Sequence, residues 1–190
     1  MNRIESIMLT ASETRLALLG ACALVIHTFA TALALVPDIH IVVHLFSAVL
    51  YLVGYLAFAA AFRRRAKWQS ILFALCISVG IVGGILLDAV RFGEQRYTSL
   101  DYVLPASFVL FVFVLFWQQN LILKVVGALY AGGAALWFIA TVWEETQRIY
   151  SPATFLAEFL GMNATIILIV WAFWQASRLR LRESSEEVSS

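Results

Sequence analysis

Apolar residues in this chain occur in long, nearly unbroken blocks that short polar segments separate. Each block approaches the roughly 20 residues that a helix needs to cross a hydrocarbon core about 30 Å thick. Folded as helices, the blocks predict membrane spans at residues 15–36, 39–62, 69–90, 102–117, 121–143 and 152–177. The sequence therefore predicts an all-α polytopic integral membrane protein, a six-transmembrane-helix bundle over residues 15–178.

Local signals for helix starts lie at two of these boundaries. Thr10 and Glu13 have the spacing of a capping box ahead of the first span, in which each residue accepts a hydrogen bond from the other's backbone. Ser151-Pro152 places a capping hydroxyl directly before a proline, the residue favoured at the first helical position. We expect helices to begin at both places.

The two ends of the chain differ from the spans in composition. Residues 1–14 are predicted to form an interfacial segment, and residues 179–190, which are polar and acidic, a disordered cytoplasmic tail. A signal peptide cleaved near Ala32-Leu33-Ala34 is the alternative for the first span. Glu5 and Glu13 weaken the positive region that such a peptide needs, which favours an uncleaved span.

Composition supports a membrane location and excludes other classes. Of 190 residues, 62% are hydrophobic and only 13% are charged. A soluble domain of this size could not cover so much apolar surface with so few charges. The net charge of +1 gives no indication of a nucleic-acid partner, so the expected partner is the lipid bilayer.

Basic residues predict the orientation. With the N-terminus in the cytoplasm, only Arg91, Arg96 and Arg148 of the 13 lysine and arginine residues would lie outside. Such a bias is typical of the positive-inside rule. The sequence thus predicts a cytoplasmic (inner) membrane protein with both termini in the cytoplasm.

Polar residues recur at helical spacing within the spans. His40, His44, Ser47, Tyr51 and Tyr55 share one face of the second span. Similar polar faces occur in the first, third, fifth and sixth spans. The fourth span has almost no polar residue between its ends, so we expect it to be the span most exposed to lipid.

The polar faces suggest a shared site in the outer half of the bundle. We expect His44, Asp88 and Glu158 to face one another there, because ionisable side chains within a membrane seldom face lipid. Tyr51 and Thr141 lie on the polar faces of their own spans and complete the predicted binding residues.

Two histidines one turn apart also raise a metal alternative. His40 and His44 could supply two zinc ligands from one helix face, and Asp88 or Glu158 could complete the set. Zinc would then activate water for hydrolysis. A haem held by His27 and His44 is a weaker alternative, because the two lie at different depths.

These patterns leave the function open between classes. The leading hypothesis is a protein that binds or translocates an ion or small molecule through an outward-facing polar pocket. The alternatives are a structural or assembly subunit and a metal-dependent intramembrane hydrolase using the His-x3-His pair. Six short spans are few for an independent transporter, so a homo-oligomer or larger complex is expected. Gly80 and Gly84 form a GxxxG pair that predicts close helix packing.

Overall fold

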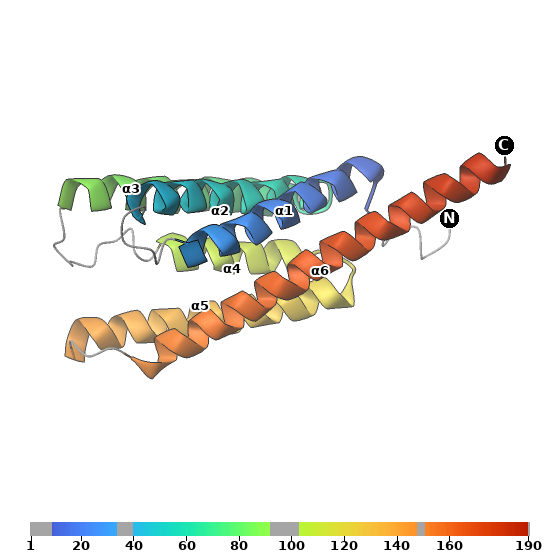
Figure 1. The fold of residues 1–190 in the computed structure, drawn as a ribbon. Coiled ribbons are helices and arrows are strands. Elements are labelled where there is room, and N and C mark those ends of the chain that lie inside the picture. Colours follow the sequence, from blue (N-terminus) through green and yellow to red (C-terminus); the bar gives the residue numbers. More distant parts are fainter. Residues whose placement is uncertain (1–8, 34–39, 92–102, 148–150, 190) are drawn as a thin grey trace.

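The computed structural model describes residues 9–33, 40–91, 103–147 and 151–189, and nearly all of these residues are helical. The helices are α1 (Ala11–Leu33), α2 (His40–Phe62), α3 (Lys67–Arg91), α4 (Val103–Phe116), α5 (Leu121–Gln147) and α6 (Pro152–Ser189). Within the described residues, five of them are long and apolar enough to cross a membrane. The prediction of a helical multi-pass membrane bundle is therefore confirmed (Figure 1).

The predicted capping box at the start of α1 is confirmed. The backbone N–H of Thr10 donates to Oε2 of Glu13 at 2.8 Å, and the backbone N–H of Glu13 donates to Oγ1 of Thr10 at 3.3 Å. The pair satisfies donors that the first turn of a helix cannot bond internally. As a result α1 begins at Ala11, one turn before the apolar block from which the span was predicted.

The start of α6 also follows its local sequence. Oγ of Ser151 accepts a hydrogen bond from the backbone N–H of Ala153 at 3.2 Å, and Pro152 occupies the first helical position. Asn120 begins α5 in the same way, because its Oδ1 accepts from the backbone N–H of Ile122 at 2.9 Å. Both helix starts are determined by residues within one turn.

The C-terminal end differs from the prediction. The sequence predicts disorder over residues 179–190, but α6 continues as one helix of 38 residues to Ser189 and extends past the other helices in Figure 1. Neither glycine nor proline follows Gly161, and arginine and glutamate are strong helix formers. A polar composition therefore ended the apolar span without ending the helix.

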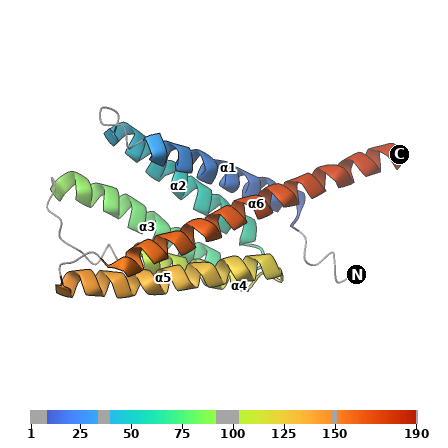
Figure 2. The same ribbon diagram turned by 60° about the horizontal axis from the view of Figure 1, so that its bottom comes forward.

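The helices pack mainly as antiparallel neighbours. α1 packs along α2, α5 packs along α6, and α4 lies against both α3 and α5. α1 also contacts α6, which joins the first pair of helices to the last (Figure 2). The core inside this ring is rich in aromatic side chains, including Tyr55, Phe58, Phe73, Phe111 and Tyr130.

The expectation that the fourth span is the most exposed to lipid is wrong. α4 has 14 residues, which at 1.5 Å per residue span about 21 Å. Phe111, Val114 and Leu115 are fully buried, and Val112 is only 9% exposed. The prediction assumed that polar residues mark the inward face, whereas α4 turns one apolar side inward, with aromatic and aliphatic contacts, and leaves Phe113 exposed on the other.

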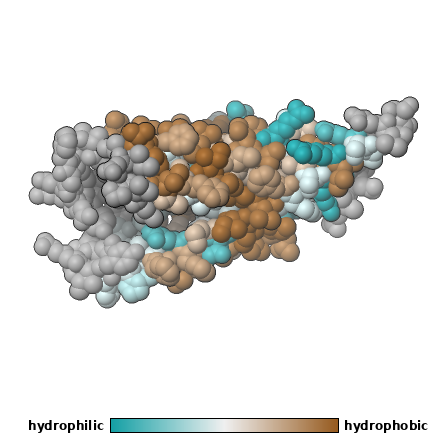
Figure 3. Space-filling model, in the orientation of Figure 1, coloured by the Kyte–Doolittle hydropathy of each residue, from teal (hydrophilic) through white to brown (hydrophobic). Residues whose placement is uncertain are grey.

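The outer surface of the bundle is apolar. Large hydrophobic side chains such as Phe29 on α1, Leu75 on α3 and Val170 on α6 are exposed. Figure 3 shows apolar residues covering most of the middle of this face, with hydrophilic residues towards the C-terminal end of α6 and a smaller group near the opposite end. A surface of this kind is stable in lipid and not in water, as expected of a membrane-embedded protein.

Candidate functional site

A close approach between α1 and α2 positions the interior polar residues. A Cβ atom on Gly20 would lie 2.8 Å from the backbone oxygen of Gly54 and 2.9 Å from the ring of Phe58. A Cβ on Gly54 would lie 2.7 Å from Leu24. Only glycine allows the two backbones to come this close. The polar faces of α1 and α2 therefore meet directly two turns further along.

Three polar residues join α1 to α2 at that point. Nδ1 of His27 lies 2.8 Å from Oγ of Ser47 and 3.0 Å from the backbone oxygen of Ser47. Oγ1 of Thr31 lies 2.9 Å from Oγ of Ser47 and donates to the backbone oxygen of His27, also at 2.9 Å. Ser47 is buried, His27 is half-buried and Thr31 is exposed, so the cluster lies at the edge of the interior.

Tyr51 connects this cluster with the centre of the bundle. Its ring centroid lies 4.8 Å from that of His27 and 4.8 Å from that of Tyr55. Tyr51 also makes an edge contact with Phe108 of α4, with a centroid distance of 6.5 Å. We call His27, Thr31, Ser47 and Tyr51 the α1–α2 site.

One helical turn beyond Tyr51 on α2, the hydroxyl of Tyr55 forms a closed triangle with hydroxyl groups from two other helices. The oxygens of Tyr55 and Tyr130 are 2.9 Å apart, and Oγ1 of Thr165 lies 3.1 Å from Tyr55 and 2.8 Å from Tyr130. Thr165 also donates to the backbone oxygen of Gly161 at 2.8 Å. Both tyrosines are almost fully buried. The hydroxyl triangle (Tyr55, Tyr130 and Thr165) thus ties α2 to α5 and α6.

Aromatic rings also pack around the triangle, and one of them, Phe108, contacts both Tyr51 and Tyr55. Tyr55 makes edge contacts with Phe108 and Phe111 at centroid distances of 5.2 and 5.6 Å. Phe73 stacks on Phe111 at 4.5 Å, and Phe62 lies 5.8 Å from Trp171. Phe62, at the end of α2, and Phe73, near the start of α3, lie towards the end of the bundle where these helices meet, and we call the rings of Phe62, Phe73, Phe111 and Trp171 the aromatic floor.

The interior of the described part carries almost no charge. Apart from Glu13 and Arg65, which lie at helix ends, the charged side chains described are exposed. The α1–α2 site and the hydroxyl triangle therefore offer neutral donors and acceptors. A group of this kind binds uncharged polar molecules at less cost than ions, because an ion would lose its hydration without a compensating charge.

The residues predicted from the sequence have different outcomes. Tyr51 lies in the α1–α2 site. Thr141 is buried, but its hydroxyl donates to the backbone oxygen of Trp137 in its own helix at 2.9 Å. Glu158 is exposed on α6, which differs from the expectation of an enclosed carboxylate. Its convergence with His44 and Asp88 stays a prediction, because the side chains of both lie outside the described residues.

The metal alternative depends largely on the same undescribed side chains. Within the described part of the chain, no three histidine, cysteine, aspartate or glutamate residues come together. The side chain of His40 lies outside that part, as do those of His44 and Asp88. The zinc site with Glu158 therefore stays a prediction from the sequence.

Several residues of the α1–α2 site and of the hydroxyl triangle lie on the predicted polar faces but were not among the predicted binding residues. Ser47, Tyr55, Tyr130 and Thr165 are uncharged, and a hydroxyl in a helix can bond its own backbone cheaply. Sequence reasoning gave most weight to ionisable residues, since these are costly in lipid. No local pattern shows that hydroxyls far apart in sequence will meet.

Three buried polar atoms at the other end of the bundle have no partner among the described residues. They are Oγ of Ser70, Oε1 of Gln118 and Nε1 of Trp171. All three side chains are at most 3% exposed. An unpaired buried group of this kind costs about 1–3 kcal/mol of stability. The buried polar groups at this end of the bundle are therefore less completely hydrogen-bonded than those of the hydroxyl triangle.

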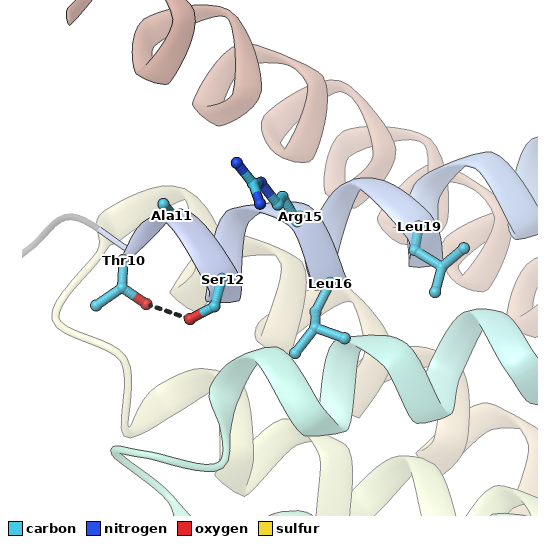
Figure 4. Close-up of a pocket in the computed structure, with 6 residues that line it drawn as sticks. All are labelled: Thr10, Ala11, Ser12, Arg15, Leu16 and Leu19. Atoms are coloured by element: carbon cyan, nitrogen blue, oxygen red, sulfur yellow. Dashed lines mark hydrogen bonds between the residues drawn. The ribbon is translucent and has the colours of Figure 1, made fainter. Parts of the chain in front are cut away.

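A shallow surface depression lies along the first turns of α1. It is lined by Thr10, Ala11, Ser12, Arg15, Leu16 and Leu19 (Figure 4). All of these belong to one helix and its cap, and in Figure 4 the side chains of Arg15 and Leu16 point in different directions. Groups from different helices do not converge there, so the α1–α2 site is the better candidate.

No protein-family model, curated protein or solved structure matches the chain.

Proposed function

We propose that this multi-pass membrane protein binds a small, uncharged organic molecule at the α1–α2 site. The observation that carries the proposal is the continuous run of polar and aromatic groups from the half-buried ring of His27, through Tyr51, to the buried hydroxyl triangle. Aromatic walls with a few well-placed hydrogen-bonding groups are typical of sites for organic ligands. The absence of charge from the described interior favours an uncharged one.

The arrangement supports entry from one side. The α1–α2 site lies towards the end where α1 ends and α2 begins, which the sequence predicts to face away from the cytoplasm. The aromatic floor lies on the opposite side of the hydroxyl triangle. Binding therefore needs no rearrangement of the floor, whereas translocation would require those rings to move.

The test is binding of 2-naphthol, a small planar molecule that is uncharged near neutral pH. The protein in lipid nanodiscs is titrated with 2-naphthol, with empty nanodiscs as the correction for partitioning into lipid. We expect saturable binding that Tyr51→Ala weakens about tenfold, equivalent to about 1.4 kcal/mol, because the variant removes the ring against which the ligand lies.

The matched control is Phe29→Ala, which removes an exposed ring of α1 that contacts lipid. This variant should bind 2-naphthol as the wild type does. A folding check on Tyr51→Ala, by circular dichroism and elution volume, separates lost binding from lost structure. Binding no greater than in empty nanodiscs, or an equal loss in Phe29→Ala, would contradict the proposal.

A structural or assembly role is the second candidate, and one observation favours it. Each hydroxyl of the triangle already has partners within the molecule, as expected of groups that hold helices together. If the role is structural, Tyr55→Phe should lower the stability of the bundle. The wild type should then show no saturable binding of 2-naphthol, and neither Tyr55→Phe nor Tyr51→Ala should change that result. The same titration therefore distinguishes the two candidates.

A further inference from the structure

The hydrogen bonds around His27 determine which nitrogen of its ring carries the proton. The chain of donors begins at Thr31, whose hydroxyl donates to the backbone oxygen of His27 at 2.9 Å. A hydroxyl has a single proton to donate. Towards Ser47, at 2.9 Å, the oxygen of Thr31 can therefore only accept.

Ser47 must then supply the proton for its bond with Thr31. With its only hydroxyl proton used, Oγ of Ser47 is an acceptor towards Nδ1 of His27 at 2.8 Å. The backbone oxygen of Ser47, which can never donate, lies 3.0 Å from the same nitrogen. Both contacts require a proton on Nδ1, and a neutral imidazole has only one N–H. Nε2 of the neutral ring consequently carries a lone pair.

The lone pair is left available for a ligand. Among the described residues, Nε2 of His27 has no hydrogen-bond partner, whereas Nδ1 has two. The ring is half-buried, lies against Tyr51 and is held through Nδ1, so within the described part of the chain Nε2 is its one nitrogen without a bond. A fixed ring with one free acceptor is a selective group, because a ligand that offers a second acceptor at that position would meet lone-pair repulsion.

We propose that the α1–α2 site selects molecules that present a hydroxyl or N–H group to Nε2 of His27, with their planar part against the ring of Tyr51. The ligand class is thus a neutral hydrogen-bond donor, such as a phenol or another hydroxyl-bearing ring. This proposal rests on the proposed function, to which it adds the chemical group that the ligand must carry.

The tautomer is tested first and without any ligand. The protein is labelled with ¹⁵N-histidine and measured by NMR at about pH 8, above the ordinary histidine pKa of about 6.5. The His27 signals are assigned by their loss in His27→Asn. We expect a protonated Nδ1 and a bare Nε2. A proton on Nε2 would overturn the inference, whatever the protein binds.

Ligand selectivity is tested with a matched pair of probes. 2-Naphthol carries a hydroxyl donor, and 2-methoxynaphthalene has the same ring system with the donor replaced by a methyl ether. We expect the wild type in nanodiscs to bind 2-naphthol at least about tenfold more tightly, after correction with empty nanodiscs, since an unmet hydrogen bond in a buried site costs on the order of 1–3 kcal/mol.

The variant His27→Asn keeps the structural bond and removes the free acceptor. The amide of asparagine takes the place of Nδ1 beside Ser47 and leaves nothing at the position of Nε2. The preference for 2-naphthol should therefore disappear while the bundle stays folded. Equal affinity of the wild type for both probes would overturn the inference and leave the proposed function standing. Binding of neither probe would overturn both.

Discussion

The close crossing of α1 and α2 makes Gly20→Ala the most informative single substitution. The added methyl carbon would lie 2.8 Å from the backbone oxygen of Gly54 and 2.9 Å from the ring of Phe58. The first neighbour is backbone and cannot rotate away. To reach an ordinary contact of 3.4 Å, the two helices must separate by about 0.6 Å, a small shift that well-packed interiors resist.

The expected cost follows from this overlap. Inserting a methyl group into a tight interface typically costs about 1–3 kcal/mol. Replacing a helical glycine by alanine returns up to about 1 kcal/mol through backbone conformational preference. Subtracting this return leaves a net loss for Gly20→Ala of about 0–2 kcal/mol, and a difference of about 1–3 kcal/mol from a glycine-to-alanine change that meets no neighbour. The same separation would stretch the contact between His27 and Ser47 two turns away.

Gly84→Ala on α3 is the matched control, because a Cβ atom there meets nothing within 4 Å. The same chemical change should leave the bundle as stable as the wild type or slightly more so. Both variants are unfolded with SDS in mixed micelles and followed by tryptophan fluorescence. If Gly20→Ala unfolds at the same SDS fraction as Gly84→Ala, or at a higher one, the close crossing does not hold the two helices together.

The remaining predictions concern the interior and the topology. Val112→Phe should lower the stability of the bundle by about 1–3 kcal/mol in the same SDS assay, because the side chain of Val112 is only 9% exposed. An unchanged SDS midpoint would mean that this side of α4 faces lipid. Ser70→Ala should raise the midpoint, since it deletes a buried hydroxyl without a partner among the described residues; a lower midpoint would mean that the hydroxyl makes a stabilising bond. In a variant without native cysteines, single cysteines at Arg64 and Ser184 should be shielded from membrane-impermeant reagents in intact cells, and one at Thr98 should be labelled; labelling at Ser184 would contradict a cytoplasmic C-terminus.

The sequence by itself determined where helices form and how several of them begin. Apolar blocks predicted each helix of the described part of the chain, five of them long enough to span a membrane and α4 shorter, because a backbone in lipid must satisfy its own hydrogen bonds. The caps at Thr10 and Ser151 were predictable for a local reason: donor and acceptor lie within one turn of each other. The polar face of α2 also placed Tyr51 towards the interior, where it lies beside His27, while its role in binding stays a prediction.

Only the tertiary structure decided which faces meet. Tyr55 bonds residues 75 and 110 positions away in the chain, and no spacing rule joins them. The pattern of hydropathy also failed to predict the buried side of α4 and the exposed position of Glu158. The physical reason is that lipid and the protein interior are equally apolar, so composition does not show which side of a membrane helix packs inward. That choice depends on the shapes of the packing side chains, and for α1 and α2 it depends on Gly20 and Gly54, which allow the two backbones to touch.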